Sequence, residues 1–314
     1  MTRPHVDVLV VTWNTGAVTA AALRRLLDAE HGVVLRVLVH DNASADGTVA
    51  VLAEQVPEAE VVVDDVNRGF AAGVNALLAR ATAPWLLVLN SDAWPDPGAV
   101  DRLVEVALGD PGIGLVAPRL ETPDGVLELS CLPAPSLATA WAAALGAERW
   151  APRWSDRRLL PGAWCHDVPR DVDWAVGAAW LVRREAVESA GPMDTSLFMY
   201  GEDVEWCLRM RAAGWRLRFE PSAVVRHVGN ASGSQAYSPH ERARSWVRND
   251  VLLFRRRSSR VATAAYVAAR VVAARRTARA RARGGDDGAA AHWRAVASGY
   301  LAAGRRTGAT AREP

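Results

Sequence analysis

The sequence contains no lysine, and all 37 of its basic residues are arginine. This absence excludes enzymes that form a Schiff base through lysine and nucleotide-binding proteins that depend on a P-loop lysine. Because alanine is abundant as well, we interpret the missing lysine as the composition of a protein from a GC-rich genome.

Cysteine is scarce. The three cysteines, Cys131, Cys165 and Cys207, are odd in number and lie far apart in the chain. This spacing fits neither a disulfide framework nor a zinc site. A reducing compartment is therefore the expectation, which favours the cytoplasm.

Long apolar runs are lacking too. No stretch reaches the roughly 18 consecutive apolar residues that a membrane-spanning helix needs. The best candidate, residues 261–274, is short and interrupted by Arg270. The apolar run at residues 6–11 is too short for the core of a secretory signal, so it predicts a strand.

The distribution of charge is uneven. Residues 240–314 hold 17 arginines and 5 acidic residues, a net charge of +12, whereas residues 1–239 hold 20 arginines and 30 acidic residues, a net charge of −10. The basic tail is compatible with a solvated helical face, with an anionic membrane surface, or with a partner such as a second copy in a homodimer. Nucleic acid is not an expected partner, because the acidic body would repel it.

The first 118 residues alternate between strand and helix patterns. Residues 6–12 are apolar and β-branched, as in a strand buried on both faces. This alternation predicts a mostly parallel sheet with helices on both faces, and ligands bind beyond the carboxyl ends of such strands. Strands are predicted at residues 6–12, 33–40, 60–63 and 85–89, and helices end near residues 29, 55 and 81.

The pattern changes after about residue 120. Residues 120–129 predict a hairpin around Asp124-Gly125, and residues 130–172, rich in proline and tryptophan, predict a long excursion without a regular element. Further regular structure is predicted at residues 172–183, a helix to about 190, a helix at 202–214, a strand at 216–221, and arginine-rich helices beyond 240 with a break at Gly284-Gly285.

Two polar segments at predicted strand ends have the chemistry of a ligand site. Asn90-Ser91-Asp92 follows an apolar strand, and a carboxylate there can hold a divalent cation beside a diphosphate. The alternative is a capping turn before a helix at residues 97–108. Asp41 closes another strand, where it either accepts a hydrogen bond from a pyrimidine ring or forms an Asx turn.

Adjacent carboxylates, Glu202 and Asp203, begin a predicted helix. Acidic residues favour helix N-termini, so capping is one interpretation. A third acid, Glu205, exceeds what capping needs, and a general base near an acceptor hydroxyl requires such a carboxylate. His227 is either a structural histidine or a partner of Asp92 on a metal ion.

Taken together and in this order, these segments resemble glycosyltransferase family 2, in particular its rhamnosyltransferase-like branch. The resemblance extends from residue 6 to about residue 232. It rests on residues 10–14 (VVTWN), 41–47 (DNASADG), 67–75 (NRGFAAGVN), 89–92 (LNSD), 176–184 (VGAAWLVRR), 200–209 (YGEDVEWCLR) and His227.

The resemblance implies an α/β protein with the GT-A fold, in which helices flank a mostly parallel central sheet. Residues 1–239 would form the glycosyltransferase domain, with a donor half at about 1–118 and an acceptor half at about 119–239. Residues 240–314 would form an Arg/Ala-rich helical tail. Relatives that use lipid-linked acceptors work at membranes, so the resemblance also implies a cytoplasmic protein, at most peripheral on the inner face of the membrane.

The resemblance also assigns roles to residues. Asp203 matches the general base, with Glu202 beside it, and Asp92 and His227 match ligands of a divalent cation, Mn²⁺ or Mg²⁺. Asn90 replaces the first acid of the DxD motif, so the metal site has one negative charge fewer. The nucleotide-binding residues that it implies are Thr12, Asn14, Asp41, Arg68, Asn90 and Ser91.

The acceptor site is expected to be shaped by residues 130–174. Trp164 and Trp174 have side chains that stack on a sugar or an apolar aglycone, and Gly177 is a third candidate. The alternative is that these tryptophans fill a small core beneath the excursion.

The predicted activity is inverting transfer of a sugar from a nucleotide diphosphate, dTDP-rhamnose or a UDP-hexose, to a hydroxyl acceptor. The acceptor is a glycan, a lipid-linked sugar or a secondary metabolite. One alternative is a catalytically silent nucleotide-sugar-binding or scaffold protein. Another is a sugar-phosphate nucleotidyltransferase, but residues 11–16 lack the basic glycine-rich loop that such enzymes use.

Overall fold

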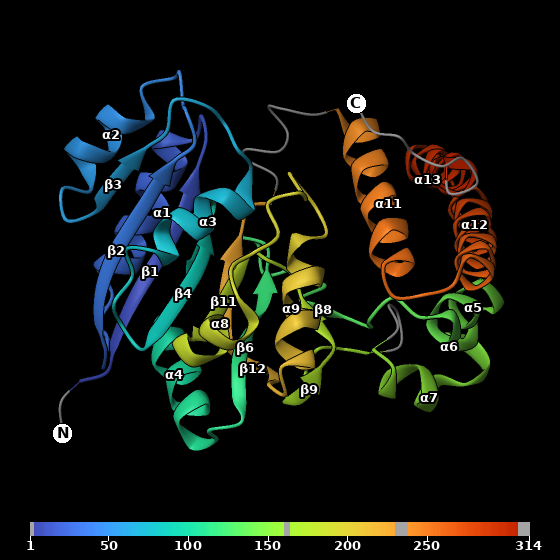
Figure 1. Ribbon diagram of the computed structural model, residues 1–314, viewed down its shortest axis with the longest axis horizontal. Helices are drawn as coiled ribbons and strands as arrows, with labels where there is room; N and C mark the ends of the chain where they lie inside the picture. Colours follow the sequence, from blue (N-terminus) through green and yellow to red (C-terminus); the bar gives the residue numbers. More distant parts are fainter. Residues whose placement is uncertain (1–2, 160–163, 230–237, 307–314) are drawn as a thin grey trace. The chain divides into compact units, whose positions relative to one another are not determined.

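The computed structural model describes residues 3–159, 164–229 and 238–306, which fold into two units (Figure 1). Of the described residues, 3–132 and 166–229 belong to the first unit, and 133–159, 164–165 and 238–306 belong to the second. The segment at 133–165 therefore packs with the C-terminal helices.

A mixed sheet of ten strands forms the first unit, in the order β3-β2-β1-β4-β11-β6-β12-β5, with β7 paired to β6 and β9 to β12. The first four of these strands are parallel, β11 runs antiparallel between β4 and β6, and β12 is parallel to β6. The strands are β1 (His5–Thr12), β2 (Val34–Asp41), β3 (Glu60–Val63), β4 (Trp85–Asn90), β5 (Ala93–Pro95), β6 (Ile113–Glu121), β7 (Leu127–Glu128), β9 (Arg170–Val172), β11 (Ala179–Arg183) and β12 (Arg216–His227).

Helices cover both faces of this sheet. Val8 and Val10 of β1 share one buried cluster with residues of α1, α2 and α4, whereas Leu9 is buried outside that cluster. On the face of Val11 the helix α3 comes so close that a Cβ atom at Gly73 would lie 2.8 Å from the Val11 side chain. The helices of this unit are α1 (Gly16–Leu27), α2 (Thr48–Gln55), α3 (Phe70–Leu78), α4 (Ala99–Gly109), α8 (Arg184–Ala190) and α9 (Glu202–Ala212).

The predicted strands and helices of residues 6–90 are confirmed to within a few residues, because their apolar patterns match buried positions on either face. The hairpin at residues 120–129 is confirmed as well, with Leu120 paired to Glu128 and Gly125 at φ +82°. The strand predicted at 216–221 is longer, since β12 continues to His227 across a register shift between Glu220 and Val224.

The prediction of an irregular excursion at residues 130–172 is wrong. This segment contains the helices α5 (Leu137–Leu145), α6 (Ala147–Trp150) and α7 (Pro152–Arg157), and the short strand β8 (Cys131–Leu132), which pairs with β10 (Trp174–Ala175). The Ser136 side chain caps α5 by accepting a hydrogen bond from the Thr139 amide at 3.1 Å. Alanine-rich sequence then favours the helix, which the prolines and tryptophans had obscured.

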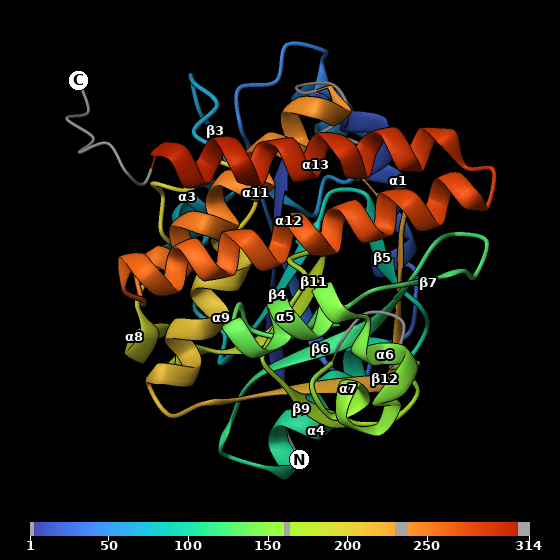
Figure 2. The same ribbon diagram turned by 90° about the vertical axis from the view of Figure 1, so that its right-hand side faces the viewer.

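Three long helices complete the second unit: α11 (Pro239–Arg255), α12 (Arg260–Arg283) and α13 (Asp287–Arg306). Figure 2 shows α12 and α13 side by side. Asp250 of α11 accepts hydrogen bonds from the hydroxyls of Tyr266 (2.9 Å) and Tyr300 (2.6 Å), which ties the three helices together. The predicted break at Gly284-Gly285 is confirmed, and none of the described helices is long and apolar enough to cross a membrane.

Candidate active site

A cavity of about 600 Å³ opens at the edge of the sheet where β1 and β4 end. It receives side chains from the ends of β1, β4 and β12 and from the start of α9, segments that are far apart in the sequence. The predicted site residues that line it are Thr12, Asn90, Ser91, Asp92, Gly177, Glu202, Asp203 and His227.

Other predicted site residues do not line this cavity. Asn14 braces two loops, since its Oδ1 accepts a hydrogen bond from the Ala45 amide at 2.8 Å. Arg68 is largely exposed, with its Nε 3.6 Å from Asp64. Trp174 is half-buried on β10, and Trp164 is buried in the part of the chain that belongs to the second unit.

Asp41 does not line the cavity, and its two carboxylate oxygens differ in their surroundings. Its Oδ1 accepts a hydrogen bond from the Ser44 amide at 2.9 Å, which is the expected Asx turn. Its Oδ2 is buried and has no hydrogen-bond partner among the described residues. A buried acceptor without a partner is costly, so this oxygen is a candidate for a ligand's N–H group.

Asp92 and His227 lie next to each other. The β12–β5 pairing brings His227 opposite Ala93, and the Val228 amide donates to the Asp92 carbonyl at 3.0 Å. As a result, Nε2 of His227 is 3.4 Å from Oδ1 of Asp92 and 3.4 Å from Nδ2 of Asn90. Burial acts to lower the pKa of His227, but the contacts with Asp92 and Glu128 outweigh it, so the pKa is raised.

No group of three or more His, Cys, Asp or Glu side chains suited to a metal ion occurs in residues 3–159, 164–229 and 238–306. Asp92 and His227 supply one carboxylate and one imidazole. This donor set suits a cation such as Mn²⁺ whose remaining ligands come from a substrate diphosphate and water.

Glu202 and Asp203 begin α9 directly after Gly201, which has φ +96°. Oδ1 of Asp203 accepts a hydrogen bond from the Val204 amide at 2.8 Å, and the Gly177 and Gly201 amides also contact this carboxylate. Glu202 is buried, and its Oε2 has no hydrogen-bond partner within the described chain.

Burial of this acidic pair changes its protonation. Burial, together with the neighbouring Asp203 charge, raises the pKa of Glu202 to about 8. Burial also raises the pKa of Asp203, although the surrounding amides oppose the shift. One carboxylate of the pair therefore stays protonated at neutral pH, and the amide contacts favour the charge on Asp203.

Glu205, the third acid of this segment, has a structural role. Its carboxylate forms an ion pair with Arg209 one turn later, with Nε–Oε1 at 2.7 Å. Arg209 in turn donates to the Ala190 and Pro192 carbonyl groups. Glu205 thus anchors α9 and does not line the cavity.

Several cavity residues escaped the sequence analysis. Glu128 on β7 contacts His227, with Oε2 at 2.8 Å from Nδ1. Four aromatic residues also line this cavity: Trp13, Phe70, Phe198 and Tyr200. Trp13, Phe70 and Tyr200 lie within the quoted motifs, but nothing in the sequence pattern shows that they face one space.

Comparison with known proteins identifies the class. A family model described as "Glycosyltransferase like family 2" matches residues 4–249. Because this match covers more than half of the chain, the chain belongs to glycosyltransferase family 2, and it is a glycosyltransferase, as the resemblance implied.

Curated relatives agree with this assignment. An N-acetylglucosaminyl-diphospho-decaprenol L-rhamnosyltransferase of Mycobacterium tuberculosis is 32% identical over 243 residues, which cover 72% of this chain and 77% of the relative. A pre-mycofactocin glycosyltransferase of the same species is 33% identical over 228 residues, which cover 71% of this chain and 43% of that protein.

Solved structures share the fold. A mannosyltransferase of Pyrobaculum calidifontis in complex with GDP-Man and Mn²⁺ aligns with a TM-score of 0.60 at 20% identity and covers 98% of this chain and 87% of that chain. GalNAc-T7 with UDP, GalNAc and Mn²⁺ aligns with a TM-score of 0.55 at 15% identity and covers 79% of this chain and 47% of that chain. The predicted GT-A fold is confirmed.

Proposed function

We propose that this glycosyltransferase is inverting and moves a sugar from a nucleotide diphosphate to a hydroxyl acceptor, with Asp203 as the general base. One observation carries the proposal: Asp203 and the Asp92–His227 pair line the same cavity. A base and a diphosphate site on one cavity are what a single displacement requires. The name of the rhamnosyltransferase relative supports rhamnose as the transferred sugar, so we take dTDP-rhamnose as the first candidate donor and a UDP-hexose as the alternative.

Asp92 and His227 would hold a divalent cation, Mn²⁺ or Mg²⁺, and the complexes of both solved neighbours contain Mn²⁺. When bound, the cation neutralises charge that develops on the diphosphate leaving group. Asn90 contributes an amide where a second carboxylate is common, so we expect modest metal affinity.

Asp203 accepts the proton of the acceptor hydroxyl as the hydroxyl oxygen forms its bond to the anomeric carbon. The bond from that carbon to the diphosphate breaks on the opposite face, and the configuration inverts. The amides around Asp203 keep its carboxylate charged and oriented, while Glu202, with its raised pKa, remains protonated beside it. The pair thus presents a single base at neutral pH.

The donor nucleotide would bind along the ends of β1, β2 and β4. Oδ2 of Asp41 is available to a ring N–H of a pyrimidine. Asn14 and Arg68 lie on the loops beside it and complete the nucleotide site in this proposal. Thr12, Asn90 and Ser91 line the cavity toward the diphosphate.

The acceptor would approach Asp203 past Gly177, which lies in the cavity wall. The rhamnosyltransferase relative takes a diphospho-decaprenol sugar, which supports a lipid-linked sugar as acceptor. Trp174 and Trp164 remain weaker candidates for acceptor binding because neither lines the cavity. In this proposal the chain has three functional parts: a donor half at about 1–118, an acceptor half at about 119–239 and a helical tail at 240–314.

An anionic membrane surface fits the second unit. The turn at the end of α11 carries exposed Arg255, Arg256 and Arg257. Trp150 and Trp154 are 67% and 38% exposed, and tryptophan beside arginine is typical of surfaces that enter the lipid headgroup region. Four more arginines in this part of the chain are exposed: Arg149 of α6, Arg153 and Arg157 of α7, and Arg158, which follows α7. A homodimer is the alternative use of this surface.

A thermal-shift panel of dTDP- and UDP-sugars, each with and without Mn²⁺, tests the proposal. A metal-dependent shift with one donor that is lost in Asp92→Ala supports it. A donor shift without any transfer or hydrolysis would favour the silent binding protein. Release of pyrophosphate from a nucleoside triphosphate and a sugar phosphate would favour the nucleotidyltransferase.

A further inference from the structure

Glu128 holds the side of His227 that is turned away from Asp92. Oε2 of Glu128 is 2.8 Å from Nδ1 of the ring, whereas Nε2 of the ring is 3.4 Å from Oδ1 of Asp92. All three side chains line the cavity. His227 is largely buried, with 12% of its side chain exposed, and each of its ring nitrogens faces a carboxylate.

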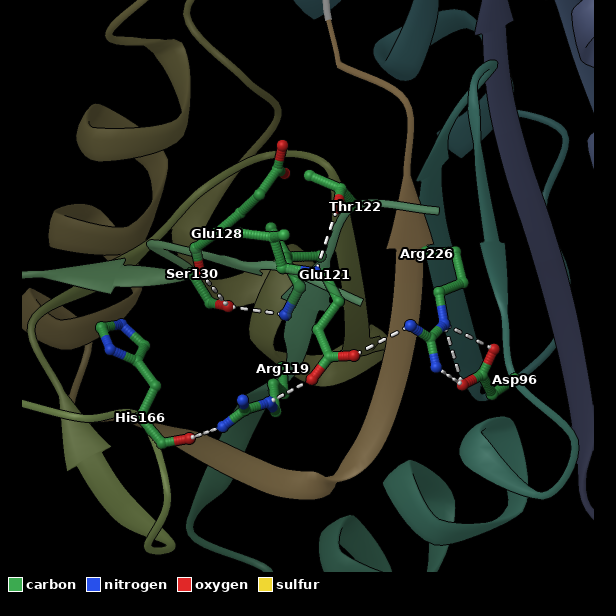
Figure 3. Close-up of polar contacts among 10 residues, drawn as sticks. Asp96, Arg119, Glu121, Thr122, Glu128, Ser130, His166 and Arg226 are labelled. Carbon is green, nitrogen blue, oxygen red and sulfur yellow. Dashed lines mark hydrogen bonds and ion pairs between the residues drawn. The ribbon is translucent and has the colours of Figure 1, made fainter. Parts of the chain in front are cut away.

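The hairpin that carries Glu128 is itself fixed. The Leu120 amide donates to Oγ of Ser130 at 2.8 Å, and Leu120 pairs with Glu128 across β6 and β7. On the adjoining strand, Arg226 bridges Asp96 and Glu121, as Figure 3 shows. Both partners of the Glu128–His227 contact therefore lie on braced strands.

We propose that Glu128 is a positioning residue for the cation site, an inference that rests on the proposed function. A charged carboxylate only accepts hydrogen bonds, so Nδ1 of His227 must carry the proton of this contact. In the neutral imidazole, Nε2 then presents its lone pair toward Asp92, as a metal ligand must. A carboxylate behind a metal-binding histidine fixes its tautomer and raises its basicity.

Glu128 also explains how the site can contain the uncharged Asn90 in place of a second carboxylate ligand. The amide of Asn90 brings no charge to the site, and its Nδ2 lies 3.4 Å from Nε2 of His227. Glu128 supplies a negative charge to the same imidazole from the other side. The cation site thus combines Asp92 with a Glu128–His227 pair in place of a second direct carboxylate.

The test is a Mn²⁺ titration of the full chain, followed by the loss of the free Mn²⁺ signal in electron paramagnetic resonance, with dTDP or UDP present. Glu128→Ala is expected to weaken Mn²⁺ binding about 10- to 100-fold. Glu128→Gln keeps an oxygen that accepts the Nδ1 proton, so it should lose less. Asp124→Asn changes an exposed acid of the same hairpin and should leave binding unchanged.

A double-mutant comparison separates positioning from a general structural effect. If Glu128 acts through His227, adding Glu128→Ala to His227→Ala should weaken Mn²⁺ binding no further. Additive losses would overturn the inference, as would wild-type affinity in Glu128→Ala when Asp92→Ala has lost binding. If the wild type does not bind Mn²⁺ with either nucleotide, the metal site itself fails and the inference with it. Thermal unfolding and metal-free nucleotide binding of Glu128→Gln show whether the fold is intact.

Discussion

Gly177 lies against Asp203, and a Cβ atom at Gly177 would come within 3.5 Å of the Asp203 Cβ atom. That distance is ordinary van der Waals contact, and the second of the two residues is the proposed base. If Asp203 is the base, as we propose, the loop before β11 borders the space through which an acceptor would reach this carboxylate.

Substitution of Gly177 should change acceptor binding more than it changes the stability of the fold. Gly177→Ala is expected to unfold at nearly the wild-type temperature, while Gly177→Leu should fill the space beside Asp203 and raise the acceptor KM about tenfold or more. Steady-state kinetics at fixed donor concentration measure this effect. An unchanged acceptor KM in Gly177→Leu, with normal folding, would remove Gly177 from the acceptor site.

Asp203→Asn should keep donor binding and lower kcat about 10²- to 10⁴-fold, because the amide cannot take the acceptor proton. Glu205→Gln is the matched control on the same helix. It weakens a partly exposed ion pair with Arg209, with an expected effect of about 0.5 kcal/mol on stability and little on kcat. Near-wild-type turnover by Asp203→Asn would contradict the assignment of Asp203 as the general base.

Protein stability should fall as the pH rises through the range set by Glu202. In the unfolded chain the Glu202 carboxyl has its ordinary pKa of 4.5, whereas burial raises the pKa in the folded chain to about 8. The folded state therefore binds the extra proton between these values, and the stability that it provides is present below about 4.5 and lost toward pH 8. The expected slope is up to about 1.4 kcal/mol per pH unit.

Glu202→Gln should remove this contribution. Urea unfolding at several pH values between 4.5 and 8.5 measures it, with Glu205→Gln as the control that keeps the slope. Equal pH slopes in the wild type and Glu202→Gln would contradict the assignment of the buried proton to Glu202.

Lipid binding by the second unit should depend on Trp150 and Trp154. The protein is expected to sediment with vesicles of phosphatidylglycerol and phosphatidylcholine at low salt, and salt should release it. Changing both tryptophans to serine should weaken binding, whereas Val261→Ser, at a position 81% exposed, should not. No sedimentation of the wild type at low salt would remove the membrane as a partner.

The parallel half of the sheet could be predicted from the sequence alone. An apolar, β-branched run such as residues 6–12 is typical of a strand that is buried on both faces of a parallel sheet. The polar residues that follow such strands lie together at the carboxyl edge of the sheet. This argument placed Asp41 and Asp92 at that edge, whereas the resemblance to the family added Asp203 and His227 to the candidate site. Asp92, Asp203 and His227 line one cavity in the structure. Motif order along the chain also identified the family.

Other features depend on contacts between distant parts of the chain and could not be predicted from local patterns. Strand β6, which Pro118 interrupts, was not predicted. The helices at 137–157 were not predicted because they are short and because prolines and tryptophans lie in and around them. Glu128 carried no signal, since a glutamate in a two-residue strand is ordinary until pairing with β6 turns it toward His227. Contacts between side chains from different strands depend on register and packing, which no local pattern encodes, and such contacts surround His227. Burial, another tertiary property, raises the pKa values of Glu202 and Asp203.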